Sequence, residues 1–416
     1  MDSVKIDKLV HGGQGLGTLP DGKKIFVWNA LPGETVKVRL VKGKKGWAEG
    51  IAEEILEPSP ERLEPKDEAY LSTSPWQIMK FDAENRYKQE ILGEAFAREK
   101  VDYSKPIEFY TEGPEWHYRN KMEYSFWGDE DGLHLALYHR GSHGKRIITG
   151  SSIARPEIDE LANKICAVLD KAGIRGSQLK TVVVRCDQAG NTVAALFVKD
   201  ENFPVLSGLA GLAQGVVVYY SNPKSPASLA TKKLYQEGEL TLTDTVMGTP
   251  ITYDVNSFFQ VNLPVFELAA KRIDYFTGGA TPKVDFYSGV GTIGLPVAAT
   301  VLVESDAHNI KMARKNVDWR QIAVVAATAE TALEHIPEQG ALIVDPPRAG
   351  LHAKVIDRIR EAGTPTVAYL SCNPSTQARD LALLQDMYEI KTIEGYNFFP
   401  RTPHIESLVL LVKRKK

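Results

Sequence analysis

Three short stretches near the C-terminal end of the chain contain residues that can act as a nucleophile, an acid or base, or a cation. They are VDPPRAGLH at 344–352, YLSCNP at 369–374 and HIE at 404–406. Cys372 follows an apolar run and precedes a helix-like run, and a helix N-terminus lowers the pKa of a thiol from its free value of about 8.5. Free cysteines are also common as buried packing residues. Its position alone therefore leaves Cys372 open between catalysis and packing.

The other two stretches place charged side chains at the ends of apolar runs. The prolines of Asp345-Pro-Pro-Arg348 stop a strand-like run and hold an extended turn, which would direct Asp345 and Arg348 into a cleft. A plain strand-ending turn with a surface arginine is the alternative. His404 and Glu406 are two residues apart before the last apolar run, so in a strand they share one face. An ordinary surface pair would have the same spacing.

A glycine-rich stretch, DFYSGVGTIG at 285–294, contains G-x-G-x-x-G directly after a strand-like run. These glycines allow a tight turn and close approach of the backbone to a ligand, and Glu304 ends the next apolar run, where its carboxylate can accept hydrogen bonds from ribose hydroxyls. The pattern fits NAD and S-adenosylmethionine equally well. A nicotinamide-dependent dehydrogenase would leave the DPPR, SCNP and HIE motifs without a task, which disfavours that alternative.

The elements that must position these residues begin near residue 280, where short apolar runs alternate with helix-like segments. The expected helices include TIGLPVAA, directly after the first glycines. This rhythm predicts an α/β domain in which helices cover both faces of a parallel sheet. Ligands of such sheets bind beyond the carboxyl ends of the strands, where these motifs fall.

The first 62 residues have the pattern of short β-strands separated by glycine- and proline-containing turns, which predicts a small closed barrel of the oligonucleotide-binding type. Such barrels can bind single strands with lysines and aromatic stacking platforms, here Phe26, Trp28 and Trp47. A solvated surface would explain the same charges. The basic residues of the barrel are Lys37, Arg39, Lys42, Lys44 and Lys45.

The sequence of residues 63–250 predicts a central α+β domain, which could position a substrate or serve as scaffold. Its helix near 84–100 can instead pack with the catalytic domain, for which we expect residues 251–416.

The composition is that of a globular protein with more than one domain. Of 416 residues, 43% are hydrophobic and 25% charged, and the net charge of −3 does not by itself indicate a nucleic-acid partner. No apolar run approaches the roughly 20 residues needed to span a bilayer, and the first twenty residues lack the features of a signal peptide. Cys166, Cys186 and Cys372 are too far apart in sequence to suggest a disulfide framework. We therefore expect a cytoplasmic protein that does not bind membranes.

Together, the motifs resemble the RNA uracil-5-methyltransferase family, whose members make 5-methyluridine in ribosomal and transfer RNA. The three C-terminal motifs, the glycine-rich stretch and SFFQVN at 257–262 come in the family's order. The N-terminal barrel resembles the RNA-binding TRAM domain, and YRNKMEYSF at 118–126 resembles a segment of the central domain. The resemblance implies a class I, Rossmann-like methyltransferase fold with S-adenosylmethionine as methyl donor.

The same resemblance implies roles for individual residues. Cys372 corresponds to the nucleophile that adds to carbon 6 of uracil, and Glu406 to the base that removes the proton from carbon 5. Arg348, from its placement alone, could stabilise charge that develops on the ring oxygens. Thr292 stands where members often have asparagine. Contacts with the methyl donor are implied for Gln260, Tyr287, Thr292, Glu304 and Asp345.

The chain departs from many bacterial members in its cysteines. Those members carry an iron–sulfur cluster on four cysteines, three of them close together after the TRAM domain. The corresponding stretch here, residues 68–82, contains no cysteine, and a total of three cannot supply four thiolates. We expect an enzyme with no iron–sulfur cluster and no other metal.

The expected function is transfer of a methyl group to carbon 5 of a uridine in RNA by a monomer. The TRAM-like domain favours 23S ribosomal RNA over transfer RNA, since many transfer-RNA enzymes of the family lack it. A cytosine-5-methyltransferase also uses a cysteine, but nothing in the motif set favours one. An RNA-binding protein with an inactive methyltransferase domain is a more distant alternative, disfavoured because both Cys372 and Glu406 are present.

Overall fold

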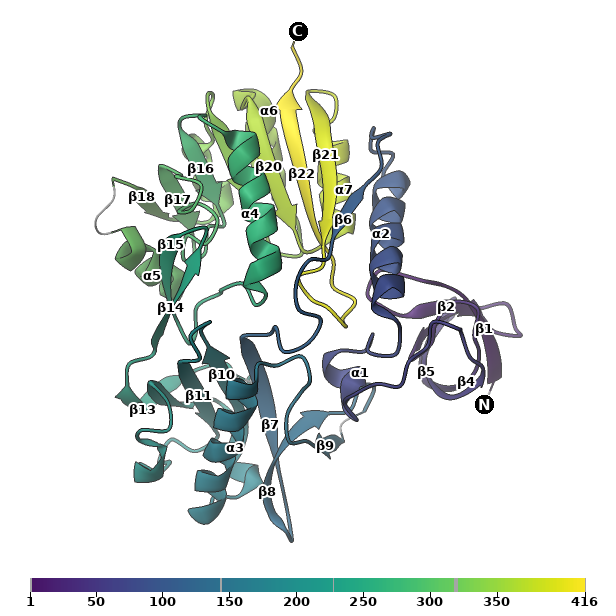
Figure 1. Cartoon of the computed structure of the whole chain (residues 1–416), viewed down its shortest axis with the longest axis vertical. Helices are drawn as coiled ribbons and strands as arrows, with labels where there is room; N and C mark the ends of the chain where they lie inside the picture. The colour runs from purple at the N-terminus through teal and green to yellow at the C-terminus, as the bar shows by residue number, and fades with distance from the viewer. Residues whose placement is uncertain (1, 143, 227, 318–320, 416) are drawn as a thin grey trace. The chain divides into compact units, whose positions relative to one another are not determined.

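The computed structural model describes residues 2–142, 144–226, 228–317 and 321–415. Contacts divide the chain into two units, and each combines segments that are distant in sequence (Figure 1). The functional boundaries expected at residues 62 and 250 stay a prediction. Unit 1 comprises Met1–Ile91, Pro114–Leu240 and Phe399–His404, and unit 2 comprises Leu92–Gly113, Thr241–Phe398 and Ile405–Lys416.

The N-terminal part of unit 1 is a closed five-stranded barrel, which confirms the predicted fold of this region. Alternate residues of its strands point inward and form an apolar core that includes Ile6, Val27 and Val38. Gly50 is needed for the close packing of two strands, because a Cβ there would lie 2.2 Å from a methyl carbon of Val38. In the spatial order β1-β2-β3-β5-β4, the strands are β1 Asp2–Leu9, β2 Gly15–Thr18, β3 Lys24–Trp28, β5 Trp47–Glu57 and β4 Thr35–Gly43.

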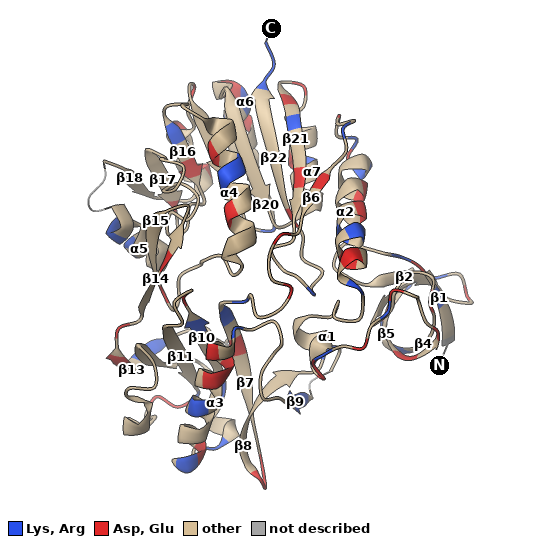
Figure 2. Ribbon diagram, viewed as in Figure 1, with Lys and Arg blue, Asp and Glu red and all other residues tan. Residues whose placement is uncertain are grey.

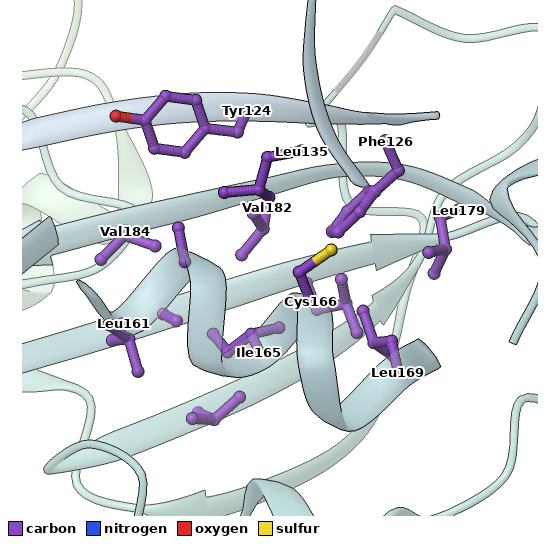
Figure 3. Close-up of a cluster of buried hydrophobic side chains, with 14 of the residues drawn as sticks. Tyr124, Phe126, Leu135, Leu161, Ile165, Cys166, Leu169, Leu179, Val182 and Val184 are labelled. Atoms are coloured by element: carbon purple, nitrogen blue, oxygen red, sulfur yellow. The ribbon is translucent and has the colours of Figure 1, made fainter. Parts of the chain in front are cut away.

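The rest of unit 1 is built on a seven-stranded sheet of order β13-β12-β11-β10-β7-β8-β9, and α3 (Pro156–Lys171) covers one face (Figure 1). The apolar side of α3 packs on the sheet, and Cys166 points into the core (Figure 3). Acidic and basic residues are interspersed along α3 and along α2 (Phe81–Arg98), whose last residues, from Leu92 on, belong to unit 2 (Figure 2). The short helix α1 is Tyr70–Thr73, and the strands are β7 Lys121–Asp129, β8 Gly132–Tyr138, β9 Lys145–Ile147, β10 Leu179–Cys186, β11 Thr192–Val198, β12 Gly215–Tyr220 and β13 Lys232–Gly238.

Unit 2 contains an eight-stranded sheet of order β18-β17-β16-β19-β20-β22-β21-β6. Five neighbouring strands are parallel, β22 is antiparallel to β20, and β6 joins the edge from a distant part of the sequence. The α/β architecture confirms the predicted class. The strands of this sheet are β18 Ala323–Ala326, β17 Val301–Glu304, β16 Lys283–Phe286, β19 Ala341–Val344, β20 Thr366–Ser371, β22 Glu406–Lys413, β21 Tyr388–Tyr396 and β6 Glu108–Tyr110.

Helices and a hairpin complete unit 2. No helix within the described ranges is both long and apolar enough to cross a bilayer. The elements are β14 Thr241–Val246, β15 Thr249–Asp254, α4 Leu263–Thr277, α5 Ala307–Val317, α6 Ala353–Ala362 and α7 Pro374–Ala382.

The helix expected in TIGLPVAA is not regular: residues 289–298 form a series of turns. Two backbone donors are missing from its hydrogen-bond ladder. The N–H of Gly294 donates to a carboxylate oxygen of Asp285 at 2.8 Å, and Pro296 has no N–H. The prediction failed because a buried carboxyl replaces a helical acceptor.

Candidate functional site

The carboxyl ends of two neighbouring strands bring Asp345 and Cys372 to one edge of the sheet in unit 2. Strand β19 ends one residue before Asp345, β20 ends one residue before Cys372, and the two strands are parallel neighbours. Strand β22 runs antiparallel to β20, with Ser371 opposite Ser407. Glu406, the first residue of β22, therefore lies at the same strand end as Cys372.

Two polar residues on the buried side of α7, which the sequence reasoning missed, tie these strand ends together. The side-chain amide of Gln377 donates to the carbonyl oxygens of Tyr369 at 2.8 Å and Ser407 at 3.2 Å, and so bridges β20 and β22. Asp380 accepts from the Tyr369 hydroxyl and from the backbone N–H of Leu351, both at 2.8 Å. The signal in the sequence was two polar residues on the face of an amphipathic helix that also carries Ala378 and Leu381.

Asn373 connects the turn after Asp345 to the segment after Cys372. Its side-chain N–H donates to the carbonyl oxygen of Arg348 at 2.9 Å, and its side-chain oxygen accepts from the N–H of Ser375 at 3.2 Å. The latter bond caps α7. The side chain of Arg348 itself is exposed.

The pKa of the Cys372 thiol is raised to about 11, mainly by burial and then by the nearby carboxyl groups of Glu406 and Asp345. Arg348 acts in the opposite direction but does not outweigh them. The expectation that the N-terminus of α7 lowers the pKa of this thiol is therefore wrong for the protein without RNA. Desolvation and negative neighbours dominate, and Asn373 already engages a free N–H group of the first helical turn.

The acidic groups of the site share this behaviour. Burial raises the pKa of Asp345 to about 7, and burial together with Asp345 raises the pKa of Glu406 well above its usual range. Burial also raises the pKa of Asp285. Burial thus favours the protonated forms of acids that would otherwise bring several negative charges together.

The glycine-rich stretch is held by Glu304. One of its carboxylate oxygens accepts from the N–H of Gly289 at 2.8 Å, and the other accepts from Ser305 at 2.8 Å and Asp306 at 2.7 Å. Tyr287, in the same stretch, has a backbone φ of 63°, and burial raises the pKa of its hydroxyl to about 12.

Polar atoms near this stretch have no hydrogen-bond partner within the described part of the chain, namely Oδ1 of Asp285 and Oγ of Ser288. Buried unpaired polar atoms are costly unless a ligand or water satisfies them. They fit a polar ligand such as S-adenosylmethionine, and Thr292 is also buried here.

The SFFQVN segment places its two aromatic rings differently. Phe259 is buried and stacks on Tyr253, with ring centroids 4.0 Å apart. Phe258 is 61% exposed, and its N–H is held by the side chain of Asn309 at 3.0 Å. Gln260, predicted to contact the methyl donor, is buried directly after them.

The five basic barrel residues fall into two groups. Lys37 pairs with Glu54 at 2.7 Å, and Arg39 pairs with Glu53. The Lys42 and Lys44 ammonium groups instead lie 5.6 and 5.4 Å from the ring centroid of Trp47. Lys45 is exposed beside them. The charge of Lys42, Lys44 and Lys45 is thus better placed for an anionic partner than that of the paired residues.

No group of three or more histidine, cysteine, aspartate or glutamate residues in the described ranges is arranged to hold a metal ion. The absence of an iron–sulfur cluster stays a prediction.

Comparisons with known proteins agree with this fold. A profile of the tRNA (uracil-5-)-methyltransferase family matches residues 332–414, and a TRAM domain profile matches residues 3–52. An uncharacterized RNA methyltransferase of Halalkalibacterium halodurans is 30% identical, over 98% of this chain and 96% of its own. Another uncharacterized RNA methyltransferase, from Enterococcus faecalis, is 28% identical over 99% of this chain and 96% of its own.

The whole chain is similar to a solved structure. That structure is the tRNA (uracil-54, C5)-methyltransferase of Pyrococcus abyssi in complex with S-adenosyl-L-homocysteine. The TM-score is 0.81 at 23% identity, and the match covers 99% of this chain and 100% of that one. The chain therefore has the fold of this methyltransferase, with an N-terminal TRAM barrel. The chain belongs to the RNA uracil-5-methyltransferase family.

Proposed function

We propose that this enzyme methylates carbon 5 of a uridine in RNA through a covalent bond between Cys372 and carbon 6 of the ring. The observation that carries the proposal is the meeting of Cys372, Asp345 and Glu406 at neighbouring strand ends of one sheet. The carboxyl groups of Glu406 and Asp345 both raise the pKa of Cys372, and Asp345 also raises the pKa of Glu406. A thiol and a buried carboxyl in one site are what addition to the ring and removal of a proton require.

The covalent step overcomes the low nucleophilicity of carbon 5. When the Cys372 sulfur adds to carbon 6, the ring becomes an enolate whose carbon 5 can attack an electrophilic methyl group. S-adenosylmethionine supplies that methyl group when it is bound. Glu406 then takes the proton from carbon 5, and the carbon–sulfur bond breaks to release the modified base and the Cys372 thiolate.

The raised pKa values define the state of the enzyme before RNA binds. The Cys372 thiol, with a pKa of about 11, is protonated at neutral pH, so it must lose its proton as it adds to carbon 6. Burial and the neighbouring Asp345 favour the protonated form of Glu406, which must be deprotonated to accept the proton of carbon 5. Arg348 favours both deprotonated forms, and we assign it the stabilisation of negative charge during the reaction.

The methyl donor is expected beside the glycine-rich stretch. Two observations support this position. Glu304 holds the backbone of the stretch, and buried polar atoms of Asp285 and Ser288 have no hydrogen-bond partner in the described part of the chain. The residues that we propose to contact the donor remain Gln260, Tyr287, Thr292, Glu304 and Asp345.

We assign RNA binding to the barrel of residues 1–62 and the central region of 63–250, and the chemistry to residues 251–416. We propose 23S ribosomal RNA as the substrate and a cytoplasmic monomer without a metal cluster as the active form. Transfer RNA is the second candidate, favoured by the substrate named for the Pyrococcus abyssi enzyme.

Two measurements test the proposal. The first maps 5-methyluridine by mass spectrometry in ribosomal and transfer RNA from cells with and without the gene. Loss of one methyl group from 23S RNA is expected; loss from transfer RNA would instead support the second candidate. The second measurement is methyl transfer in vitro, where an unchanged rate for Cys372→Ala would contradict the proposed mechanism.

A further inference from the structure

The face of the central sheet opposite α3 carries two exposed aromatic rings. Phe126 and Leu137 point toward α3, so their neighbours in sequence, Trp127 and Tyr138, point to the other face. Trp127 is 46% exposed and Tyr138 is 54% exposed. Large exposed aromatic rings of this kind suit stacking against a partner.

Three lysines accompany these rings. The Lys145 ammonium group lies 4.8 Å from the ring centroid of Tyr138. Lys199 is close enough to Lys145 for that charge to lower its pKa, after the larger effect of burial. Burial and then Lys199 lower the pKa of Lys180 in the same way. We call the group Trp127, Tyr138, Lys145, Lys180 and Lys199 the central platform.

The lysines of the central platform are not neutralised by acids. In the described part of the chain, no carboxylate lies within 4.0 Å of any of their three ammonium groups. Lys37 of the barrel and Lys164 on α3 are different, since each pairs with a glutamate, at 2.7 and 2.6 Å. Neighbouring cations without acids are favourable for an anionic partner.

Two of these lysines are held in place by neutral oxygen atoms. Lys145 donates to the carbonyl oxygen of Phe126 at 2.8 Å. Lys180 donates to oxygens of the loop that follows β12, including Ser221 at 2.9 Å and Pro226 at 3.0 Å. Their positive charge is therefore positioned without being cancelled.

A cavity of about 640 Å³ adjoins the platform, and Trp127, Lys145 and Lys199 all line it. This volume is in the range of small-molecule sites and is large enough for a nucleotide. Two acids also line it: Asp129 lies 3.0 Å from the His134 ring, and Asp170 accepts from the N–H of Leu133 at 2.8 Å. In the described part of the chain, neither carboxylate lies within 4.0 Å of the Lys145 or Lys199 ammonium group.

We propose that the central platform binds unpaired nucleotides of the RNA substrate, with a base stacked on Trp127 and phosphates against Lys145 and Lys199. Aromatic rings beside uncompensated lysines are the combination that binds single strands without a need for base-specific hydrogen bonds. The inference rests on the proposed function only in taking RNA as the substrate. It names the residues that contact the strand within the central region to which RNA binding is assigned above.

Binding of a fluorescein-labelled oligouridine of about 12 nucleotides tests the platform, with the full-length protein and a series of salt concentrations. Trp127→Ala should weaken binding about 10-fold, as expected for the loss of one base–aromatic stack, and Trp127→Phe should restore most of it. Lys199→Gln should reduce the slope of log K against log salt by about 0.7, the value for one phosphate contact.

Matched control variants lie outside the platform. Tyr275→Ala removes a ring that is 81% exposed on α4, and Lys164→Gln removes a lysine on the mixed-charge surface of α3 (Figure 2). Both should bind as wild type. Unchanged thermal midpoints for all variants would show that the chain still folds.

Crosslinking locates the contact directly. An oligouridine of the same length that contains 4-thiouridine should crosslink to peptides carrying Trp127 or Tyr138. The proposal is overturned if Trp127→Ala and Lys199→Gln bind with wild-type affinity and salt dependence, or if crosslinks fall only outside residues 121–147 and the peptides that carry Lys180 or Lys199. A surface that instead served a protein partner would give that negative result. None of these readouts requires methyl transfer, so the platform and the proposed reaction can fail independently.

Discussion

Cys166 and Cys372 lie in different units of the molecule, yet their thiols have similar proton affinities. The pKa of each is raised to about 11, with burial as the largest cause in both. Cys166 belongs to the apolar core between α3 and the central sheet (Figure 3), and its thiol donates to the carbonyl oxygen of Leu133 at 3.3 Å. Cys372 is half-buried at the end of β20.

The difference lies in the neighbours. Besides burial, only Asp170 raises the pKa of Cys166, whereas Cys372 is influenced by Glu406, Asp345 and the opposing charge of Arg348. The pKa of the thiol therefore does not by itself distinguish a packing cysteine from a nucleophile. What distinguishes Cys372 is the placement of acidic and basic groups that can exchange protons and stabilise charge around it.

The largest expected difference between the two thiols is in the rate of methyl transfer when each is replaced. Cys372→Ala should reduce kcat/KM at least about 1,000-fold, because the covalent route to an activated carbon 5 is lost. Cys166→Ala should retain wild-type kcat/KM. Incorporation of labelled methyl groups into RNA checks both variants, and equal losses would remove the distinction between the two thiols.

The next effect concerns proton removal. Glu406→Gln keeps the size of the side chain but not the base, and should lower the rate of methyl transfer by about 10²–10⁴-fold. Because addition of Cys372 precedes proton removal, a covalent RNA–protein complex should accumulate in this variant. Denaturing gel electrophoresis detects that complex. A slow Glu406→Gln enzyme that forms no complex would argue that this carboxyl acts before the covalent step.

A smaller effect is expected on the alkylation of the thiols. Only the thiolate reacts, so for a pKa raised to about 11 the rate with iodoacetamide should rise about tenfold per pH unit between pH 7 and 10. Cys372 should react in the folded protein, whereas the core thiol of Cys166 should not. Removing the positive charge with Arg348→Gln raises the pKa further and should slow the reaction of Cys372 at a given pH. Faster alkylation of that variant would show that the assigned electrostatics have the wrong sign.

The smallest effect is on stability. Cys166→Ala leaves a small cavity in the core, and its free energy of unfolding should fall by about 1 kcal/mol. Cys372→Ala lies at a half-buried strand end and should change the stability less. Urea denaturation of both variants compares them, and a larger loss for Cys372→Ala would indicate that this residue is mainly structural.

The sequence was sufficient to predict that the motifs lie at the carboxyl ends of strands, because each motif directly follows an apolar run. The alternation of strands and helices then required Asp345 and Cys372 to share one edge. The closed barrel was equally predictable from its short strands and turn residues.

Other features depend on contacts between residues that are distant in sequence. Gln377 could not be recognised as a bridge between β20 and β22 before the order of those strands was known. Residues 108–110 form the edge strand β6 of the catalytic sheet although they precede most of the central sheet in the chain. The direction of the shift in the Cys372 pKa depends on burial and on carboxyl groups brought close by the fold, which outweigh the expected effect of the helix.

The central claim is that Cys372 bonds to carbon 6 of the target uracil, and RNA containing 5-fluorouridine tests it most directly. Fluorine at carbon 5 cannot leave as a proton does, so after methyl transfer Glu406 has no proton to remove and the carbon–sulfur bond should persist. Mass spectrometry of the digested complex should find a methylated fluorouridine attached to the peptide that contains Cys372. An adduct on Cys166 or Cys186, or complete turnover of this RNA without any adduct, would contradict the account.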